Sequence, residues 1–215
     1  MNARVQTMEA AQLAEDSVKR RQIVEGARSI FLAQGFDAAS MNDIARAAGV
    51  SKGTLYVYFT NKEQLFSAIV QSECTTHAEH AFNFDPADHD VENVLTRLGT
   101  AYAGFLCTPG KASVFRTVMA IAERMPEMGR TFYETGPANG IARLSSYLRA
   151  QNEAGVLAVE DCEIAAAQFL DACQSTLFKP VLLNFREPPG PAQIDHVVRI
   201  AVRTFMAAYR VPLHH

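Results

Sequence analysis

The segment that decides the fold is residues 40–65, which read SMNDIARAAGVSKGTLYVYFTNKEQL. Three of its residues are typical helix N-caps, each placed just before a helix-forming run: Ser40, Ser51 and Asn61. Gly49 supplies a turn residue between the first two runs. The segment therefore predicts two short helices, residues 41–48 and 52–59, joined by a tight turn and followed by a long helix toward residue 80.

The chain on both sides continues in helical periodicity. Upstream, Ser17 is a candidate cap for a first helix that Gly35 ends. Downstream, residues 83–90 contain Pro86 and several aspartates and predict a loop between two modules. The expected helices beyond that loop are residues 91–107, 111–124, 126–154, 161–183 (with Pro180 expected to end or kink it) and 191–209. The sequence thus predicts an all-α protein of about nine helices.

Composition and charge limit the kind of protein. The chain has 215 residues, a hydrophobic fraction of 48% and a net charge of −3, which are ordinary values for a globular protein. Residues 17–64 hold seven basic and four acidic side chains, so this segment carries +3 and the rest −6. A basic segment on an acidic body indicates an anionic partner at one end only. Neither a membrane span nor a signal peptide is evident, so we expect a cytoplasmic protein.

The run at residues 52–59 has two different sides. At about 100° per residue, Leu55 and Phe59 fall together and can pack on the preceding helix. Thr54 and Val57 fall on the other side with Gly53, and Tyr56 and Tyr58 flank them. Such a helix can enter a DNA major groove, where Thr54 and Val57 would meet base edges, while Lys52 and the tyrosines reach phosphates. A solvent-exposed surface helix would show the same pattern, and this reading stays open on spacing alone.

A family resemblance adds to this reading. Residues 35–45, the run GVSKGTLYVYF at 49–59 and residues 62–65 resemble the signature of the TetR family of transcriptional regulators. The resemblance implies a three-helix helix-turn-helix domain that binds double-stranded operator DNA through Ser51, Lys52, Gly53, Thr54, Tyr56, Val57, Tyr58 and Lys62. Met41 stands where the family often has a phosphate-contacting Thr, a role left to Ser40 or the nearby backbone amides.

The same resemblance implies the domain organisation. We expect a flexible arm at 1–16, the DNA-binding domain at 17–64, a connecting helix at 65–82, and a ligand-binding and dimerisation domain at 83–215. Residues 122–128 (AERMPEM) and 132–137 (FYETGP) resemble the regulatory domain of AefR-like members. The arrangement commonest in the family is a homodimeric repressor that a small-molecule effector releases from a palindromic operator.

Two groups of residues are candidates for these C-terminal roles. The candidate ligand pocket comprises Phe105, Phe115, Met119, Phe132, Tyr133, Asn139, Tyr147, Phe169, Gln174 and Phe178. The candidate dimer interface comprises Phe169, Cys173, Leu177, Val198, Val202, Phe205 and Tyr209. Both sets are equally typical of an ordinary subunit core, and the sequence does not separate the two readings.

Other functions have weaker support. No nucleophile with a base, phosphate-binding glycine loop or metalloprotease motif is evident, so we expect no enzyme and no cofactor. Cys74, His77 and His80 recur at threes but spread too far along one helix to bind one ion, so no metal is expected. A thiol sensor at Cys107 or Cys173 stays open. A helical interaction module without DNA binding is disfavoured by the basic segment.

Overall fold

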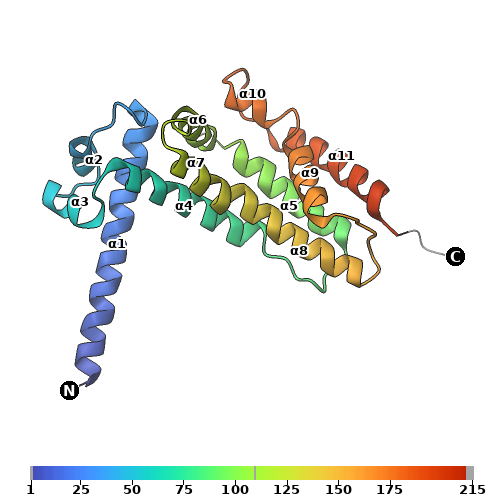
Figure 1. The fold of residues 1–215 in the computed structure, drawn as a ribbon, viewed down its shortest axis with the longest axis horizontal. Coiled ribbons are helices and arrows are strands. Elements are labelled where there is room, and N and C mark those ends of the chain that lie inside the picture. Colours follow the sequence, from blue (N-terminus) through green and yellow to red (C-terminus); the bar gives the residue numbers. More distant parts are fainter. Residues whose placement is uncertain (1, 109, 212–215) are drawn as a thin grey trace. The chain divides into compact units, whose positions relative to one another are not determined.

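The computed structural model describes residues 2–108 and 110–211, with the side chains of residues 16–72, 81–108 and 110–211. The chain forms two compact units, Met1–Ser72 and Glu73–His215 (Figure 1). The described residues form helices and no strand, with one isolated bridge between Leu157 and Arg210. The predicted all-α class is therefore confirmed. No helix in this described part combines the length and the apolar character that crossing a membrane requires.

The N-terminal unit contains α1 (Asn2–Gln34), α2 (Met41–Ala47), α3 (Lys52–Tyr58) and the first turns of α4 (Lys62–Ala81). The two short helices and the long one following them agree with the prediction. The start of α1 does not, because the helix begins at Asn2 and not at a cap on Ser17. Residues 10–15, AAQLAE, are good helix formers, which favours continuation of the helix upstream of Ser17.

Apolar side chains from all four helices fill the core of this unit. Ile23, Ile44, Leu55 and Leu65 are completely buried. The rings of Phe31, Phe36 and Phe66 lie 5.4–5.7 Å apart as one aromatic cluster. This cluster joins α1, the α1–α2 connection and α4 within the unit.

A glycine lets α1 and α2 approach closely. A Cβ at Gly26 would lie 2.7 Å from backbone and side-chain atoms of Ala48, closer than real contacts allow. Nearby, the Gln22 amide donates to the Ala48 carbonyl at 2.7 Å. Gly26 and Gln22 thus hold the end of α2 against α1, and neither residue was singled out from the sequence.

The C-terminal unit holds the remaining helices: α5 (Val91–Leu106), α6 (Lys111–Ile121), α7 (Pro126–Tyr133), η1 (Glu134–Ala138), α8 (Asn139–Glu153), α9 (Cys162–Gln174), α10 (Phe178–Leu182) and α11 (Pro191–Tyr209). Helices α5, α8, α9 and α11 pack together, and α6, α7 and α10 gather at one end of them (Figure 1). At Gly99 a Cβ would come within 2.8 Å of both Cys173 and Val198, so α5 packs tightly on α9 and α11.

Two predicted helices are interrupted. The predicted helix 126–154 contains a π-helical turn at η1, where Pro137 lacks the N–H that a regular α-helix would use. The predicted helix 161–183 breaks at residues 175–177, where Thr176 has a φ of 61°. Pro180 was expected to end or kink this helix, but it lies in the first turn of α10, where no N–H donor is needed. The break therefore comes before the proline.

The predicted loop at 83–90 is confirmed and is fixed to α8. The Gln151 amide donates to the Pro86 carbonyl at 2.9 Å, and its oxygen lies 2.8 Å from His89 Nδ1. The Tyr147 hydroxyl donates to the Asp88 carbonyl at 2.7 Å. Burial and the nearby Asp88 charge raise the pKa of Tyr147 to about 12, so the phenol keeps the proton that it donates.

Candidate nucleic-acid interface

The helix-turn-helix begins with side-chain caps, as the sequence predicts. The backbone N–H of Asp43 donates to Ser40 Oγ at 3.2 Å, and the N–H of Thr54 donates to Ser51 Oγ at 3.0 Å. Gly49, between α2 and α3, has a φ of 63°, which favours glycine. These contacts fix where α2 and α3 start and therefore how α3 projects from the unit.

The two sides of α3 are as different as the periodicity predicts. Leu55 is completely buried, and Phe59, the C-cap of α3, is 3% exposed. On the opposite side, Val57 is 81% exposed and Tyr56 is 43% exposed. A valine this exposed on a short helix contributes little to the core of the unit, so this side of α3 is open to contact with another molecule.

Three more predicted residues lie on this exposed side. Lys52 and Gly53 are exposed, and the Lys52 ammonium lies 5.9 Å from the centre of the Tyr56 ring. A Cβ at Gly53 would meet only Ser51 Oγ, at 3.8 Å, so the backbone of α3 is open to close approach here. The Thr54 hydroxyl lies 2.8 Å from Ser51 Oγ and shares a hydrogen bond with the cap.

The other predicted DNA contacts are bound within the unit. The Tyr58 hydroxyl donates to Asp16 Oδ1 on α1 at 2.8 Å. Ser40 Oγ donates to Asp43 Oδ2 at 2.5 Å. The Lys62 ammonium donates to carbonyls of the α1–α2 connection, the nearest being Phe36 O at 2.9 Å. Periodicity indicated Tyr58, and the family resemblance indicated Ser40 and Lys62. Neither gave any sign of the hydrogen-bond partners, which for Tyr58 and Lys62 lie far away in the sequence.

The candidate ligand residues do not form one group. Phe115 lies at the centre of a smaller cluster, 4.7 Å from Phe132 and 4.9 Å from Phe178, both ring to ring. Met119 and Tyr133 are exposed, at 66% and 58%. The other five are placed separately: Phe105 beneath Lys111, Asn139 half-buried at the start of α8, Tyr147 against the 83–90 loop, Phe169 against Phe205, and Gln174 donating to Asp171.

Most candidate dimer residues lie in the subunit core. Cys173, Val198, Val202, Phe205, Phe169 and Leu177 are each at most 6% exposed, and Tyr209 is half-buried beside Phe205. The exposed side of the same two helices is formed by their neighbours, including Gln168 on α9 and Ile200 and Thr204 on α11. These three residues line an open groove of about 490 Å³ between α9 and α11. The apolar periodicity of these two helices therefore marks the sides that face the subunit core.

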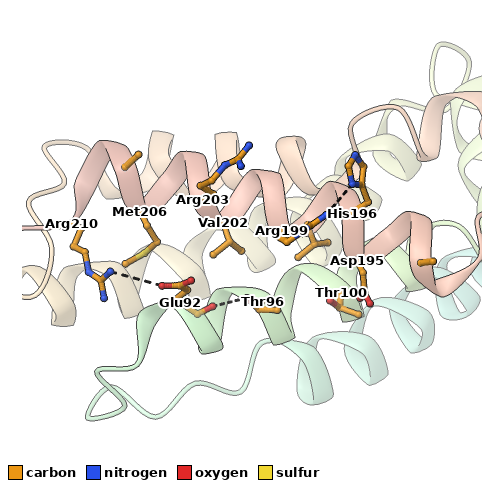
Figure 2. A pocket seen from close by; sticks show the side chains of 13 residues that line it. Glu92, Thr96, Thr100, Asp195, His196, Arg199, Val202, Arg203, Met206 and Arg210 are labelled. Carbon is orange, nitrogen blue, oxygen red and sulfur yellow. Dashed lines mark hydrogen bonds and ion pairs between the residues drawn. The ribbon is translucent and has the colours of Figure 1, made fainter.

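A second groove, of about 1030 Å³, lies between α5 and α11 (Figure 2). Arg199 and Arg203 lie on α11 and Arg210 is its C-cap, while Glu92, Thr96 and Thr100 lie on α5 (Figure 2). The Arg210–Glu92 ion pair spans the groove at 3.9 Å, and Arg199 donates to His196 at 3.2 Å. Its lining combines these charged and hydroxyl side chains with the nearly buried apolar residues Val198, Val202 and Met206, and it is open to solvent.

The three cysteines whose side chains are described, Cys107, Cys162 and Cys173, are buried. Burial raises the pKa of the Cys107 thiol, and raises that of Cys173 from 9.0 to about 12. Because the thiolate is the reactive form, neither residue has the environment of a thiol sensor at neutral pH. The side chains of Cys74, His77 and His80 lie outside the described residues, and the side chains that are described contain no group of three that could hold a metal ion.

Comparison with known proteins agrees with this architecture. Residues 23–69 match the N-terminal region of the bacterial regulatory proteins of the tetR family, and residues 93–211 match the AefR-like transcriptional repressor C-terminal domain. A TetR-family regulator from Mesorhizobium loti superposes with a TM-score of 0.81 at 26% identity, over 91% of this chain and 98% of that one. The flavonoid-responsive regulator FrrA superposes with a TM-score of 0.76 at 30% identity, over 92% and 100%.

Among curated relatives, the repressor AcnR of Corynebacterium diphtheriae is 34% identical over 65 residues, which are 30% of this chain and 34% of AcnR. The first curated relatives are matched over only 26–54% of their own length. The fold and the site define a helix-turn-helix DNA-binding regulator. The chain belongs to the TetR family, with an AefR-like C-terminal domain. This family and the relatives above are regulators and not enzymes, as the sequence predicts.

Proposed function

We propose that this protein is a homodimeric repressor that binds a palindromic operator through α3 and is released by a small apolar ligand. The observation that carries the proposal is the exposed side of α3. Val57 is 81% exposed there, beside Tyr56 and Lys52, while the opposite side is buried. We infer that the protein acts in the cytoplasm, where bacterial operators are.

In this proposal, α3 is the recognition helix. Val57 meets a thymine methyl in the major groove, and Gly53 allows the backbone to approach the DNA. Lys52, Tyr56 and the Ser51 end of the helix contact phosphates, which fix the register but carry no sequence information. Ser40 and Tyr58 lie close to their partners in the free protein, so each would have to exchange a hydrogen bond on binding DNA.

The proposed dimer uses the exposed sides of α9 and α11. Ile164 on α9 is 53% exposed and Ile200 on α11 is 40% exposed, and the groove between these helices is lined mainly by apolar and small side chains. Two helices from each subunit would form a four-helix interface with two-fold symmetry. A two-fold dimer presents two α3 helices to two half-sites, which accounts for a palindromic operator.

The proposed ligand binds the C-terminal unit. The cluster of Phe115, Phe132 and Phe178 joins α6, α7 and α10 and offers aromatic surface to an apolar molecule. The regulator FrrA, 30% identical over nearly the whole chain, is flavonoid-responsive, which makes a flavonoid the first molecule to test. A ligand that binds more tightly to the conformer with low DNA affinity would lower the fraction of protein molecules able to bind DNA.

A selection experiment tests the proposal. Duplexes selected from a random library by the full-length protein should converge on one palindromic sequence. Val57→Glu should abolish binding to it, because the carboxylate faces bases and phosphates. Leu32→Glu is the matched control, since Leu32 is an exposed apolar residue on α1 (46%) outside the proposed contact side. Binding by Val57→Glu equal to that of the control would rule out α3 as the recognition helix.

Adding the flavonoid to the selected complex tests release separately. Dissociation at a concentration that leaves the fold unchanged supports the ligand class. Retention of DNA with no flavonoid bound would exclude this class of ligand and leave the DNA-binding proposal intact.

A further inference from the structure

The first residue of α4 is in contact with the connection between α1 and α2. Lys62 Nζ lies 2.9 Å from the Phe36 carbonyl, 3.0 Å from the Asp37 carbonyl and 3.4 Å from the Ala39 carbonyl. It also lies 4.7 Å from the centre of the Phe36 ring. The half-buried Lys62 side chain thus bonds the residues that lead directly into the Ser40 cap of α2.

These contacts use every donor that the side chain has. A lysine ammonium has three N–H groups and no acceptor. Three carbonyl oxygens lie within hydrogen-bonding distance of Lys62, so a phosphate could be contacted only if at least one of these bonds were given up. The family resemblance implies a DNA contact at this position, and the geometry here indicates a different role.

The same turn of α4 is fixed to the end of α3. The N–H of Gln64 donates to Asn61 Oδ1 at 2.9 Å, and the N–H of Thr60 donates to Gln64 Oε1 at 3.0 Å. This reciprocal cap follows directly on Phe59, the buried C-cap of α3. The first turn of α4 is therefore bonded to the residues after α3 and, through Lys62, to the residues before α2.

We propose that Lys62 is a positioning residue, which fixes the start of α2 relative to α3 through the first turn of α4 and does not neutralise a DNA phosphate. The proposal rests on the DNA-binding function proposed above. It has a consequence for regulation, because any displacement of this turn would also displace the residues that begin α2.

Salt dependence separates positioning from phosphate contact. The logarithm of the DNA affinity falls with the logarithm of salt concentration, with a slope of about −0.9 for each phosphate neutralised. Lys62→Met and Lys52→Met in the full-length protein would be titrated with the duplex selected by the wild type, across a salt series. Lys52 is the matched control, since it is an exposed lysine on the DNA-facing side of α3.

We expect Lys62→Met to bind DNA about tenfold more weakly at each salt concentration and to keep the wild-type slope. A tenfold loss of affinity follows if about a tenth of the molecules keep α2 and α3 aligned. Lys52→Met should lose about 0.9 in slope for each phosphate contact removed. A loss of slope in Lys62→Met like that of Lys52→Met would overturn the proposal, and so would unchanged affinity.

Amide hydrogen exchange supplies a test without DNA. Lys62→Met should exchange faster at residues 35–43, with protection kept in α1 and in the C-terminal unit. A merely destabilised protein would lose protection throughout, and unchanged exchange at 35–43 would also contradict the proposed role. If the wild type selected no duplex, the proposed function would fail, while this measurement would still decide whether Lys62 fixes the connection.

Discussion

Several side chains in the N-terminal unit bind partners that are distant in the sequence, and these contacts determine their roles. Helical periodicity predicted that Leu55 is buried and that Val57 is exposed, because that distinction depends only on spacing along one helix. It could not predict that Tyr58 donates to Asp16 or that Lys62 donates to the α1–α2 connection. Those hydrogen bonds depend on how separate helices meet, which no local pattern encodes.

Gly26 gives a prediction at this scale. Gly26→Ala places a Cβ 2.7 Å from the backbone of Ala48, so α1 and α2 must separate. We expect a loss of about 1–3 kcal/mol in the free energy of unfolding, measured by chemical denaturation. Gly53→Ala is the control, since its Cβ would meet nothing closer than 3.8 Å and Ala favours the helix. Equal stability of Gly26→Ala and the wild type would contradict the close packing.

Cys173 gives a prediction about pH. Its thiol keeps its proton in the folded state up to about pH 12, whereas in the unfolded chain it loses it near its ordinary 9.0. The folded state therefore binds more protons in this range, and stability falls as pH rises from about 9 toward 12, by about 1.4 kcal/mol per pH unit for one such group. Unfolding free energies of Cys173→Ala should show a shallower decline. Identical slopes in the two proteins would show that the thiol is not protected.

The bounds of whole helices were predicted more reliably than the interruptions within them or the side of each helix that faces the core. The caps and periodicity placed α2, α3, α5 and α11 within about one residue, because each helix has its own start and stop signals. The break at Thr176 was missed because the apolar repeat of Phe169, Cys173, Leu177 and Val181 continues across it. The π-turn at η1 was missed although Gly136 and Pro137 lie within it. The same stripe on α9 and α11 fits a subunit core and a dimer interface, and only the packed structure shows which side faces inward.

The dimer prediction belongs to these two helices. Ile200→Glu places a charge on the exposed α9–α11 side without entering the core, and it should yield monomers by light scattering. Phe205, at 5% exposure against Phe169, would be a poor choice because its replacement disturbs the subunit itself. Ala207→Glu is the matched control, since Ala207 is exposed on the opposite, α5–α11 side. A dimer that persists in Ile200→Glu would place the interface elsewhere.

At the level of the whole molecule, the chain combines a helix-turn-helix unit with a larger helical unit of AefR-like type. The 49–59 run, a local feature, indicated the helix-turn-helix in the sequence. The sequence predicts a loop between two modules at 83–90, whereas the two compact units divide within α4, between Ser72 and Glu73. It could not define a ligand pocket, since the ten candidate residues are spread over six helices and η1 separates α7 from α8. Apolar periodicity identifies side chains that are buried but not the cavity that they would surround.

Fluorescence anisotropy of the wild-type protein with its selected duplex and with a scrambled duplex of the same composition, across a salt series, tests directly whether the protein recognises a DNA sequence. A sequence-specific regulator should bind the selected duplex about 10³-fold or more tightly, with affinity falling steeply as salt rises. Equal, weak binding to both duplexes at every salt concentration would show that α3 is not a recognition helix.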